Sequence, residues 1–272
     1  MHGDAGLARL LAEAEARPLE GWDLGRLGDR MKSTPLPWSF EEIVVRHARA
    51  SPDLLDLGTG GGEWLAALPF RPPRTVATES WEPNVAVARA RLAPLALGVV
   101  QVEPAPDNVD QDAPERRGGL PFPSECFTHV VSRHESFVAR EVARVLVPGG
   151  RFLTQQVGSG RYDELHDALG LRRRPAGRNA WTLALARTQV EAAGLVVAES
   201  GEAETVTSFA DVGALAWYLE AAPWVAPGFS VREHGHALAA LHEKIATSGP
   251  YEIREPSFRL EAVRAPASEG VG

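Results

Sequence analysis

The sequence predicts an α/β protein built around a doubly wound, mostly parallel sheet of seven strands. From residue 53 onwards, short apolar runs alternate with stretches of helical periodicity. A glycine cluster directly follows the first apolar run, as in a turn from a strand into a helix. A hydrophobic fraction of 44% and a charged fraction of 24% are typical of globular chains. This composition excludes a disordered, collagen-like or coiled-coil protein.

Two helices are expected before the alternating region begins. Residues 5–17 are rich in alanine, leucine and glutamate and predict a short amphipathic helix. Residues 39–50 predict a second helix, with Ser39 as N-cap and Glu41 and Glu42 in the first turn, where the helix dipole favours acids. The seven strands are then expected at 53–57, 75–78, 98–102, 127–132, 151–157, 195–199 and 257–263, and the intervening helices at 63–68, 83–92, 140–146, 181–193, 211–221 and 231–247.

One decorated domain explains the length of 272 residues better than two domains. Residues 1–50 are expected to form an N-terminal helical cap, and residues 51–208 the ligand-binding core. Residues 209–250 depart from the alternation of strands and helices, which predicts a helical insertion or lid. Residues 251–272 are expected to add a final edge strand and a tail to the same domain.

Charge and composition exclude several classes of partner. The chain has 28 Lys+Arg against 36 Asp+Glu, a net charge of −8 that argues against binding to a phosphate backbone. Cys126 is the single cysteine, so an internal disulfide is excluded. His234, His236 and His242 do not share one helix face, so no metal is expected. No apolar run is long enough for a membrane span, and residues 1–18 do not resemble a secretory signal. A cytoplasmic location without a membrane partner is expected.

The most informative segment is LLDLGTGGGEW, at residues 54–64. Glycines after a strand let the backbone approach a ligand closely, and the helix that follows offers free N–H groups. A dinucleotide-binding turn needs G-x-G-x-x-G, but Glu63 or Leu65 occupies the last position in the two registers available. What remains is the pattern D-x-G-x-G-x-G, formed by Asp56, Gly58, Gly60 and Gly62.

This pattern resembles motif I of the class I S-adenosylmethionine-dependent methyltransferases, and in particular the type 11-like group. Further segments resemble the same family in the same order: VATE at 76–79, LPFP at 120–123 followed by CFTHVV at 126–131, and RVLVPGGRFL at 144–153. The sequence departs from the family at Thr128, where an aspartate is usual. The resemblance covers roughly residues 53–157. It implies a Rossmann-like fold, S-adenosyl-L-methionine as cofactor and S-adenosyl-L-homocysteine as product.

The resemblance also implies where the cofactor binds. Glu79 stands where the family holds the ribose hydroxyls, which need a hydrogen-bond acceptor. In the family, an acid in the loop after the third strand contacts the adenine amino group. Asp112, which precedes Ala113, is the favoured candidate, and Asp107 and Asp110 compete with it.

Two tryptophans are candidates for covering the cofactor. Trp81 is expected against the adenine, with packing on the next helix as the alternative, and Trp38 is expected to close over the cofactor from the N-terminal segment. The full expected set of cofactor-binding residues is Asp56, Gly58, Thr59, Gly60, Gly62, Glu79, Ser80, Trp81, Asp112, Ala113, Ser132 and Trp38.

Candidate catalytic residues follow the fourth expected strand, because ligands of such sheets lie beyond the carboxyl ends of the strands. His134 is a candidate general base, since its ordinary pKa lies near neutrality. Glu135 is expected to orient His134 or to hold a cationic substrate, and Arg133 to pair with a carboxylate of the acceptor or the cofactor. The alternative is that all three only cap and solvate the loop. Gln155 and Gln156, which end the fifth strand, are expected on opposite faces, one of them toward the substrate.

The sequence thus predicts a methyltransferase that acts on a small-molecule acceptor by in-line displacement. Trp217, Tyr218, Trp224 and Phe229 of the expected insertion are candidates for an aromatic lid, with a helix that packs its own apolar face on the sheet as the alternative. A second hypothesis is an rRNA or tRNA base methyltransferase, which the basic run at 172–174 favours and the net charge disfavours. A third is a non-catalytic protein that binds S-adenosylmethionine as a regulator.

Overall fold

The computed structural model describes residues 2–16, 24–110, 118–160, 162–172 and 180–266. Eight strands of these segments form one mixed sheet, where seven were expected. The additional strand is β1, which pairs antiparallel with β7. In sheet order the strands are β1 (Met31–Ser33), β7 (Leu195–Phe209), β8 (Tyr251–Arg264), β6 (Leu146–Val157), β5 (Phe127–Arg133), β2 (Asp53–Leu57), β3 (Arg74–Glu79) and β4 (Gly98–Gln101).

The predicted doubly wound sheet is confirmed in its central part. Strands β4, β3, β2, β5 and β6 pair parallel to one another, so their carboxyl ends lie along one edge of the sheet. β8 is antiparallel to both of its neighbours, β6 and β7. Because β8 lies between these two strands, the expected edge position of the last strand is wrong. The sheet ends at β1 on one side and at β4 on the other.

Helices cover both faces of the parallel strands, as alternating strands and helices require. On one face, Phe40 and Val44 of α2 pack in a cluster with Leu54 of β2 and Leu153 of β6. On the other face, residues of α5 and α7 pack against Leu55 of β2 and its neighbours. The helices of the described segments are α1 (His2–Ala16), α2 (Phe40–Ala48), α3 (Glu63–Ala67), α4 (Glu82–Leu92), α5 (Ala139–Val145), α6 (Asp163–Leu169), α7 (Leu183–Ala192), α8 (Val212–Ala221) and α9 (Gly235–Ser248), with short 3-10 helices at Leu24–Arg30 and Ala93–Leu95.

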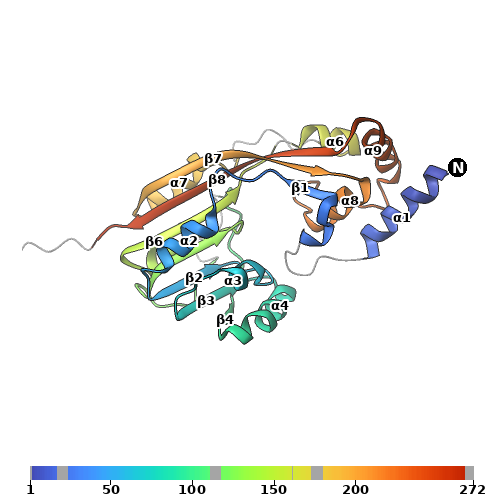
Figure 1. Ribbon diagram of the computed structural model, residues 1–272. Coiled ribbons are helices and arrows are strands. Elements are labelled where there is room, and N and C mark those ends of the chain that lie inside the picture. The colour runs from blue at the N-terminus through green and yellow to red at the C-terminus, as the bar shows by residue number, and fades with distance from the viewer. Residues whose placement is uncertain (1, 17–23, 111–117, 161, 173–179, 267–272) are drawn as a thin grey trace, which may run out of the picture.

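Two strands extend far beyond the parallel core. β7 and β8 pair from Leu195 opposite Arg264 to Phe209 opposite Tyr251. The strands predicted at 195–199 and 257–263 are therefore much too short. Figure 1 shows the pair running from the core, with its helices α2 to α5 and α7, to a second group of helices. We call these two parts the core lobe and the helical lobe.

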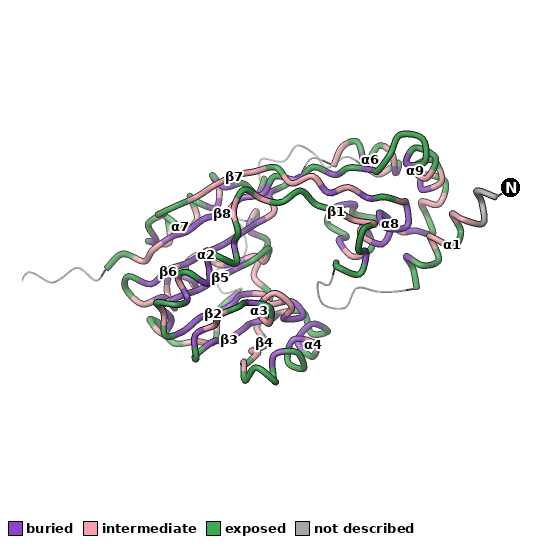
Figure 2. The backbone as a smooth tube through the Cα atoms, in the orientation of Figure 1, coloured by how far each residue is buried: buried purple, intermediate pink, exposed green. Residues whose placement is uncertain are grey.

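The helical lobe has a hydrophobic core of its own, formed by α1, α6, α8, α9 and the far ends of β7 and β8. Figure 2 shows buried segments in both lobes and a more exposed stretch of β7 between them. The two helices of the expected N-terminal cap lie in different lobes, since α1 packs on α8 and α2 packs on the core sheet. No helix among the residues in the structure is long and apolar enough to cross a membrane.

Candidate active site

The glycine turn after β2 has a backbone that other residues adopt only with strain. Gly58, Gly60 and Gly62 have φ angles of 67°, 61° and 79°. A Cβ atom on Gly58 would lie only 2.6 Å from the Cβ of Glu135, so this position also excludes any larger residue on steric grounds. The turn is fixed to β3, because the N–H of Thr59 donates to the carbonyl of Thr78 at 2.9 Å.

Glu79 at the end of β3 connects this turn to the next one. Its Oε2 accepts the N–H of Gly60 at 2.6 Å, and its Oε1 accepts the N–H groups of Ser80 at 2.9 Å and Trp81 at 2.8 Å. Burial raises the pKa of Glu79, while these three hydrogen bonds act in the opposite direction. The carboxylate therefore holds two turns in place and still faces the carboxyl end of the sheet.

Asp56 is a buried carboxylate that the protein leaves incompletely paired. It is 2% exposed, and its Oδ2 has no hydrogen-bond partner in the described part of the chain. Burial raises its pKa to about 7; the Thr59 side chain and Arg133 lower it, and the nearby charge of Glu79 raises it further. A buried polar atom without a partner costs free energy, so this oxygen is a candidate for contact with a ligand.

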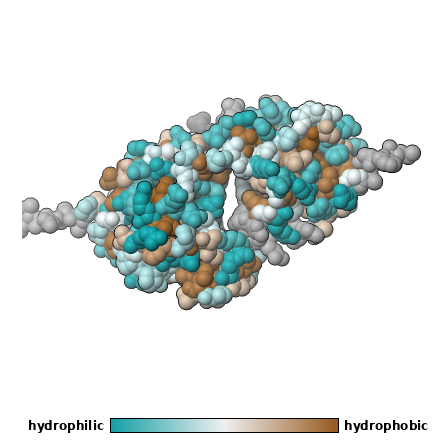
Figure 3. Space-filling view, in the orientation of Figure 1, coloured by the Kyte–Doolittle hydropathy of each residue, from teal (hydrophilic) through white to brown (hydrophobic). Residues whose placement is uncertain are grey.

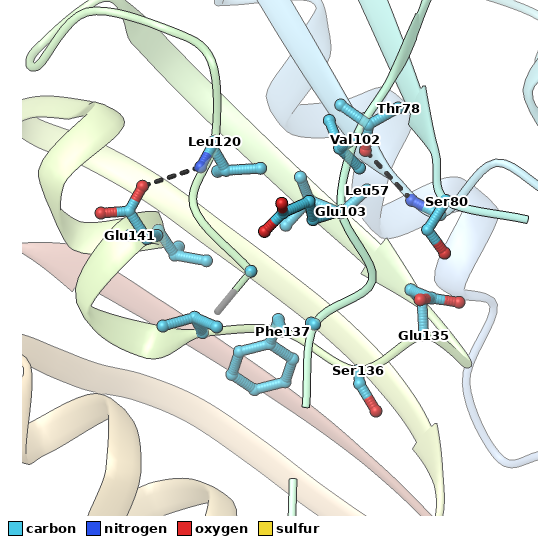
Figure 4. A pocket seen from close by; sticks show the side chains of 15 residues that line it. Leu57, Thr78, Ser80, Val102, Glu103, Leu120, Glu135, Ser136, Phe137 and Glu141 are labelled. Atoms are coloured by element: carbon cyan, nitrogen blue, oxygen red, sulfur yellow. Dashed lines mark hydrogen bonds between the residues drawn. The ribbon is translucent and has the colours of Figure 1, made fainter. Parts of the chain in front are cut away.

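Glu135 is the third carboxylate of this cluster. Burial raises its pKa to about 7, and the charges of Glu79 and Asp56 act in the same direction. Figure 4 shows the pocket that Glu135 lines, in which the empty space of about 400 Å³ includes open solvent. The pocket lies at the carboxyl ends of β2 to β5, and its lining includes Gly58, Ser80, Glu103, Leu120, Ser136 and Phe137.

The loop after β5 is held by β6. The buried hydroxyl of Ser132 donates to the carbonyl of Glu135 at 2.9 Å, and the buried Gln156 amide donates to the same carbonyl at 3.0 Å. His134 has a φ angle of 62°, an uncommon conformation for a residue with a side chain, and its N–H donates to the carbonyl of Gln155 at 2.8 Å. Backbone strain of this kind is maintained only where the surroundings fix it, and it clusters at functional sites.

The side chain of His134 is solvent-exposed but anchored at one ring nitrogen. Its Nε2 lies 3.1 Å from the Nε2 of Gln155, whose Oε1 accepts the indole N–H of Trp38 at 2.9 Å. Desolvation by the surrounding protein lowers the pKa of the imidazole, and the positive charge of the neighbouring Arg133 guanidinium lowers it further. A lowered pKa keeps His134 neutral at physiological pH.

Arg133 lies on the α2 and α3 side of the sheet. Its guanidinium stands 5.9 Å from the ring centre of Trp64, and no hydrogen bond or ion pair joins it to a residue in the described segments. Arg133, Gln155 and Arg259 are register partners on β5, β6 and β8, so their side chains form a row. Figure 3 shows a hollow between the two lobes, beside this end of the core.

The structure brings most of the expected site residues together and leaves some apart. The glycines, Asp56, Glu79 and Glu135 meet around one turn, with Ser132 buried beneath the loop. The Trp81 side chain is 55% exposed. Trp38 lies on Gln155, with the Arg259 guanidinium 6.0 Å from its ring centre. Asp112, Ala113 and most of the basic run at 172–174 lie outside the described residues.

Three of the four aromatic residues named for the insertion pack in the helical lobe. Trp217 is buried in the core of the helical lobe, where Tyr218 and Phe229 pack against it, while Trp224 is 53% exposed. Among the described residues, no group of three or more His, Cys, Asp or Glu side chains is placed to hold a metal ion.

Two features of this site, the position of Glu103 and the pairing of Trp38 with Gln155, have no local signal in the sequence. Glu103 lines the pocket, but it follows a short strand without any motif. Trp38 and Gln155 were noted separately, and nothing in the sequence links residues 117 positions apart. Their pairing depends on the fold, because α2 brings Trp38 back over the end of β6.

Comparison with known proteins agrees with this geometry. Residues 55–154 match the model of the methyltransferase domain family. This match and the Rossmann-like fold support a class I S-adenosylmethionine-dependent methyltransferase. No curated protein sequence matches the chain significantly.

Solved structures share the fold of this chain at low sequence identity. A proposed methyltransferase of Bacillus halodurans is 19% identical, with a TM-score of 0.53 over 83% of this chain and 98% of its own. The YcgJ protein of Bacillus subtilis is 17% identical, with a TM-score of 0.53 over 84% and 99% of the two chains. A functionally unknown protein of Deinococcus radiodurans is 16% identical, with a TM-score of 0.51 over 95% and 98%. At these identities the likeness concerns the fold.

Proposed function

We propose that this methyltransferase binds S-adenosyl-L-methionine at the carboxyl ends of β2, β3 and β5 and methylates a small molecule. The observation that carries the proposal is the cluster of Asp56, Glu79 and Glu135 around an open glycine turn. S-adenosylmethionine has a positive sulfonium and a positive amino group, which would compensate carboxylates that now repel one another. The unpartnered Oδ2 of Asp56 supports a ligand with a hydrogen-bond donor at this place.

The residues present fit such a cofactor. The turn carries no side chains at Gly58, Gly60 and Gly62, so its backbone can contact a ligand directly. Glu79 keeps its carboxylate oriented through three backbone hydrogen bonds. We assign Asp56 to the amino group of the methionyl part and Glu79 to the ribose hydroxyls. When bound, the cofactor supplies a methyl group already activated by the sulfonium, so that transfer breaks a carbon–sulfur bond and leaves a neutral thioether. The protein has to align the acceptor and exclude water.

The acceptor is assigned to the hollow between the lobes. Arg133 and His134 directly precede Glu135, which lies against Gly58 of the glycine turn. Figure 1 shows the helical lobe at the far ends of β7 and β8. We propose that the insertion at 209–250, together with α1, covers the acceptor as a lid. A hollow bounded by two lobes suits a small molecule better than a nucleic acid, and the net charge of −8 acts in the same direction.

Calorimetry with S-adenosylmethionine and S-adenosylhomocysteine tests the cofactor. The wild-type chain is expected to bind both, and Glu79→Gln to bind both at least about tenfold more weakly, a loss of about 1.4 kcal/mol. A glutamine at position 79 would place its NH₂ group opposite a backbone N–H that now donates to the Glu79 carboxylate. Two donors cannot form a hydrogen bond with each other. Glu82→Gln, on an exposed acid of α4, is the matched control and should leave both affinities unchanged.

Methyl transfer is tested with cofactor labelled in the methyl group. Small molecules, total RNA and no acceptor form the three arms, and label is expected only in the small-molecule arm. Label in RNA would establish the nucleic-acid hypothesis instead. Cofactor binding without label in a broad set of acceptors would favour a regulatory protein.

A further inference from the structure

Three side chains from distant parts of the chain form a hydrogen-bonded series at the mouth of the site. Trp38 precedes α2, Gln155 lies near the end of β6, and His134 follows β5. The Trp38 indole nitrogen lies 2.9 Å from the Oε1 of Gln155, and the Gln155 Nε2 lies 3.1 Å from the Nε2 of His134.

The chemistry of these groups permits one assignment of the hydrogens. An indole N–H only donates, so the Gln155 oxygen must face Trp38 and its NH₂ group must face His134. The amide NH₂ also only donates, so the Nε2 of His134 must accept and carries no hydrogen. A neutral imidazole then has its proton on Nδ1. The series therefore determines both the orientation and the tautomer of the ring.

We propose that Trp38 and Gln155 are positioning residues that hold His134 as a neutral Nδ1–H tautomer, which donates a hydrogen bond to an oxyanion of the bound ligand. This assignment rests on the proposed function for the identity of the ligand. It replaces the role of general base that the sequence predicts for His134, because Nε2 is already engaged and Nδ1 already carries the proton.

The surroundings of His134 support a donor role. Its φ angle of 62° is held by the hydrogen bond from its N–H to the carbonyl of Gln155, so one residue fixes both its backbone and its ring. The ring is solvent-exposed, and its Nδ1 has no partner among the residues that the structure describes. The free N–H is thus available to a ligand.

The charges nearby select the kind of ligand. Arg133 precedes His134 on the chain and has no ion-pair partner in the described segments. Arg259, the register partner of Gln155 on β8, is already paired with Glu199. Glu135, on the other side of His134, belongs to the carboxylate cluster and has a raised pKa. An N–H donor beside an unpaired guanidinium binds an oxyanion such as a carboxylate or a phenolate. An acceptor that arrives deprotonated needs no base in the protein.

The first test is the tautomer itself, read by nitrogen-15 NMR of the histidine rings of the whole chain. His134→Asn identifies the signals of His134. The inference expects one protonated nitrogen, assigned to Nδ1, and a pKa below the ordinary value. A wild-type ring protonated on Nε2 would overturn the inference without any variant.

The second test replaces the hydrogen-bond donor at position 155 by an acceptor. In Gln155→Glu, a carboxylate would accept from Nε2–H and raise the pKa of His134 by about 1–3 units. Gln101→Glu makes the same change at the exposed end of β4 and should leave that pKa unchanged. Trp38→Phe removes the indole N–H, so the Gln155 amide can reverse and the second tautomer should become detectable. Trp224→Phe in the helical lobe is its control.

The ligand class is tested on the same samples. In the presence of S-adenosylhomocysteine, benzoate and phenolate should shift the His134 signals, whereas benzamide should not. The same shift with S-adenosylhomocysteine alone, but not with 5′-methylthioadenosine, would assign the oxyanion to the cofactor's own carboxylate. An unchanged His134 pKa in Gln155→Glu, with the cofactor still bound, overturns only this inference. Loss of cofactor binding in the wild type would overturn the proposed function and leave the tautomer result intact.

Discussion

Two aspartates of β2, three residues apart, have opposite surroundings. Asp53 begins the strand and is 1% exposed; it accepts the guanidinium of Arg74 at 2.5 Å and both the N–H and the hydroxyl of Thr128. Asp56 is 2% exposed near the strand's carboxyl end, and one of its oxygens has no partner among the described residues. The same residue type is thus fully paired at one end of the sheet and incompletely paired at the other.

The difference separates a structural end of the sheet from a ligand-binding end. The amino end is closed by the protein's own donors, and Thr128 is part of that closure. An aspartate at position 128, as in the family pattern, would place a second carboxylate beside Asp53, whereas threonine donates two hydrogen bonds to it. At the carboxyl end, Asp56, Glu79 and Glu135 repel one another, which supports the proposed binding of a positive ligand there.

The largest expected effect comes from adding a side chain to the glycine turn at the carboxyl end of the sheet. Gly58→Ala places a methyl group against Glu135 in a backbone with φ of 67°, so affinity for S-adenosylhomocysteine should fall at least about tenfold, or about 1.4 kcal/mol. Gly149→Ala has φ of 78° with open space around it at the amino end, and it should leave calorimetric affinity unchanged. Equal losses of affinity in both variants would show that backbone strain, and not the position of Gly58 in the binding site, causes the loss.

Removing each aspartate's charge should change stability with opposite sign. Asp53→Asn should lower the free energy of unfolding at pH 8 by about 1–3 kcal/mol, because a buried hydrogen-bond network is broken. Asp56→Asn should raise it at pH 8 by at least about 1 kcal/mol, since one pKa unit corresponds to about 1.4 kcal/mol. Urea titrations at pH 5 and pH 8 measure both.

The sign for Asp56 follows from its raised pKa. Between the ordinary value near 4 and the folded value of about 7, the unfolded chain ionises while the folded chain keeps its proton, so stability is lost as pH rises through this window. The gain from Asp56→Asn should therefore shrink as pH falls from 8 to 5. A stabilisation that is constant with pH would exclude the charge as its cause.

A further expected effect is the pH dependence of cofactor binding. Burial and mutual repulsion raise the pKa of Asp56 and of Glu135 to about 7, so both ionise as pH rises from 6 to 8. Affinity for S-adenosylmethionine should rise by about tenfold over this range and affinity for S-adenosylhomocysteine by less, because only the former carries the sulfonium charge. Glu135→Gln should flatten the profile, and identical profiles for the two ligands would contradict the assignment.

Much of the core was predictable because its signals are local. Ser39 caps α2 as expected, with its hydroxyl accepting the N–H of Glu42 at 3.1 Å. Apolar runs marked the parallel strands, since strands buried on both faces leave little room for polar residues. The outer half of β7 was not predicted, because its sequence, GEAETVTSF at 201–209, is largely polar and shows only weak alternation of apolar and polar residues. It is a strand because β8 pairs with it along its whole length.

The amino-acid sequence was sufficient to specify the order of elements, the glycine turn and the acid at the end of β3, because each depends on residues within a few positions of one another. The arrangement in space supplied the rest. Gln155 meets Trp38 and His134 only because β5, β6 and α2 come together at one end of the sheet. The two lobes likewise depend on the pairing of β7 with β8. The proposed tautomer of His134 and the lack of a partner for the Asp56 Oδ2 among the described residues depend on such distant neighbours, which local sequence patterns do not identify.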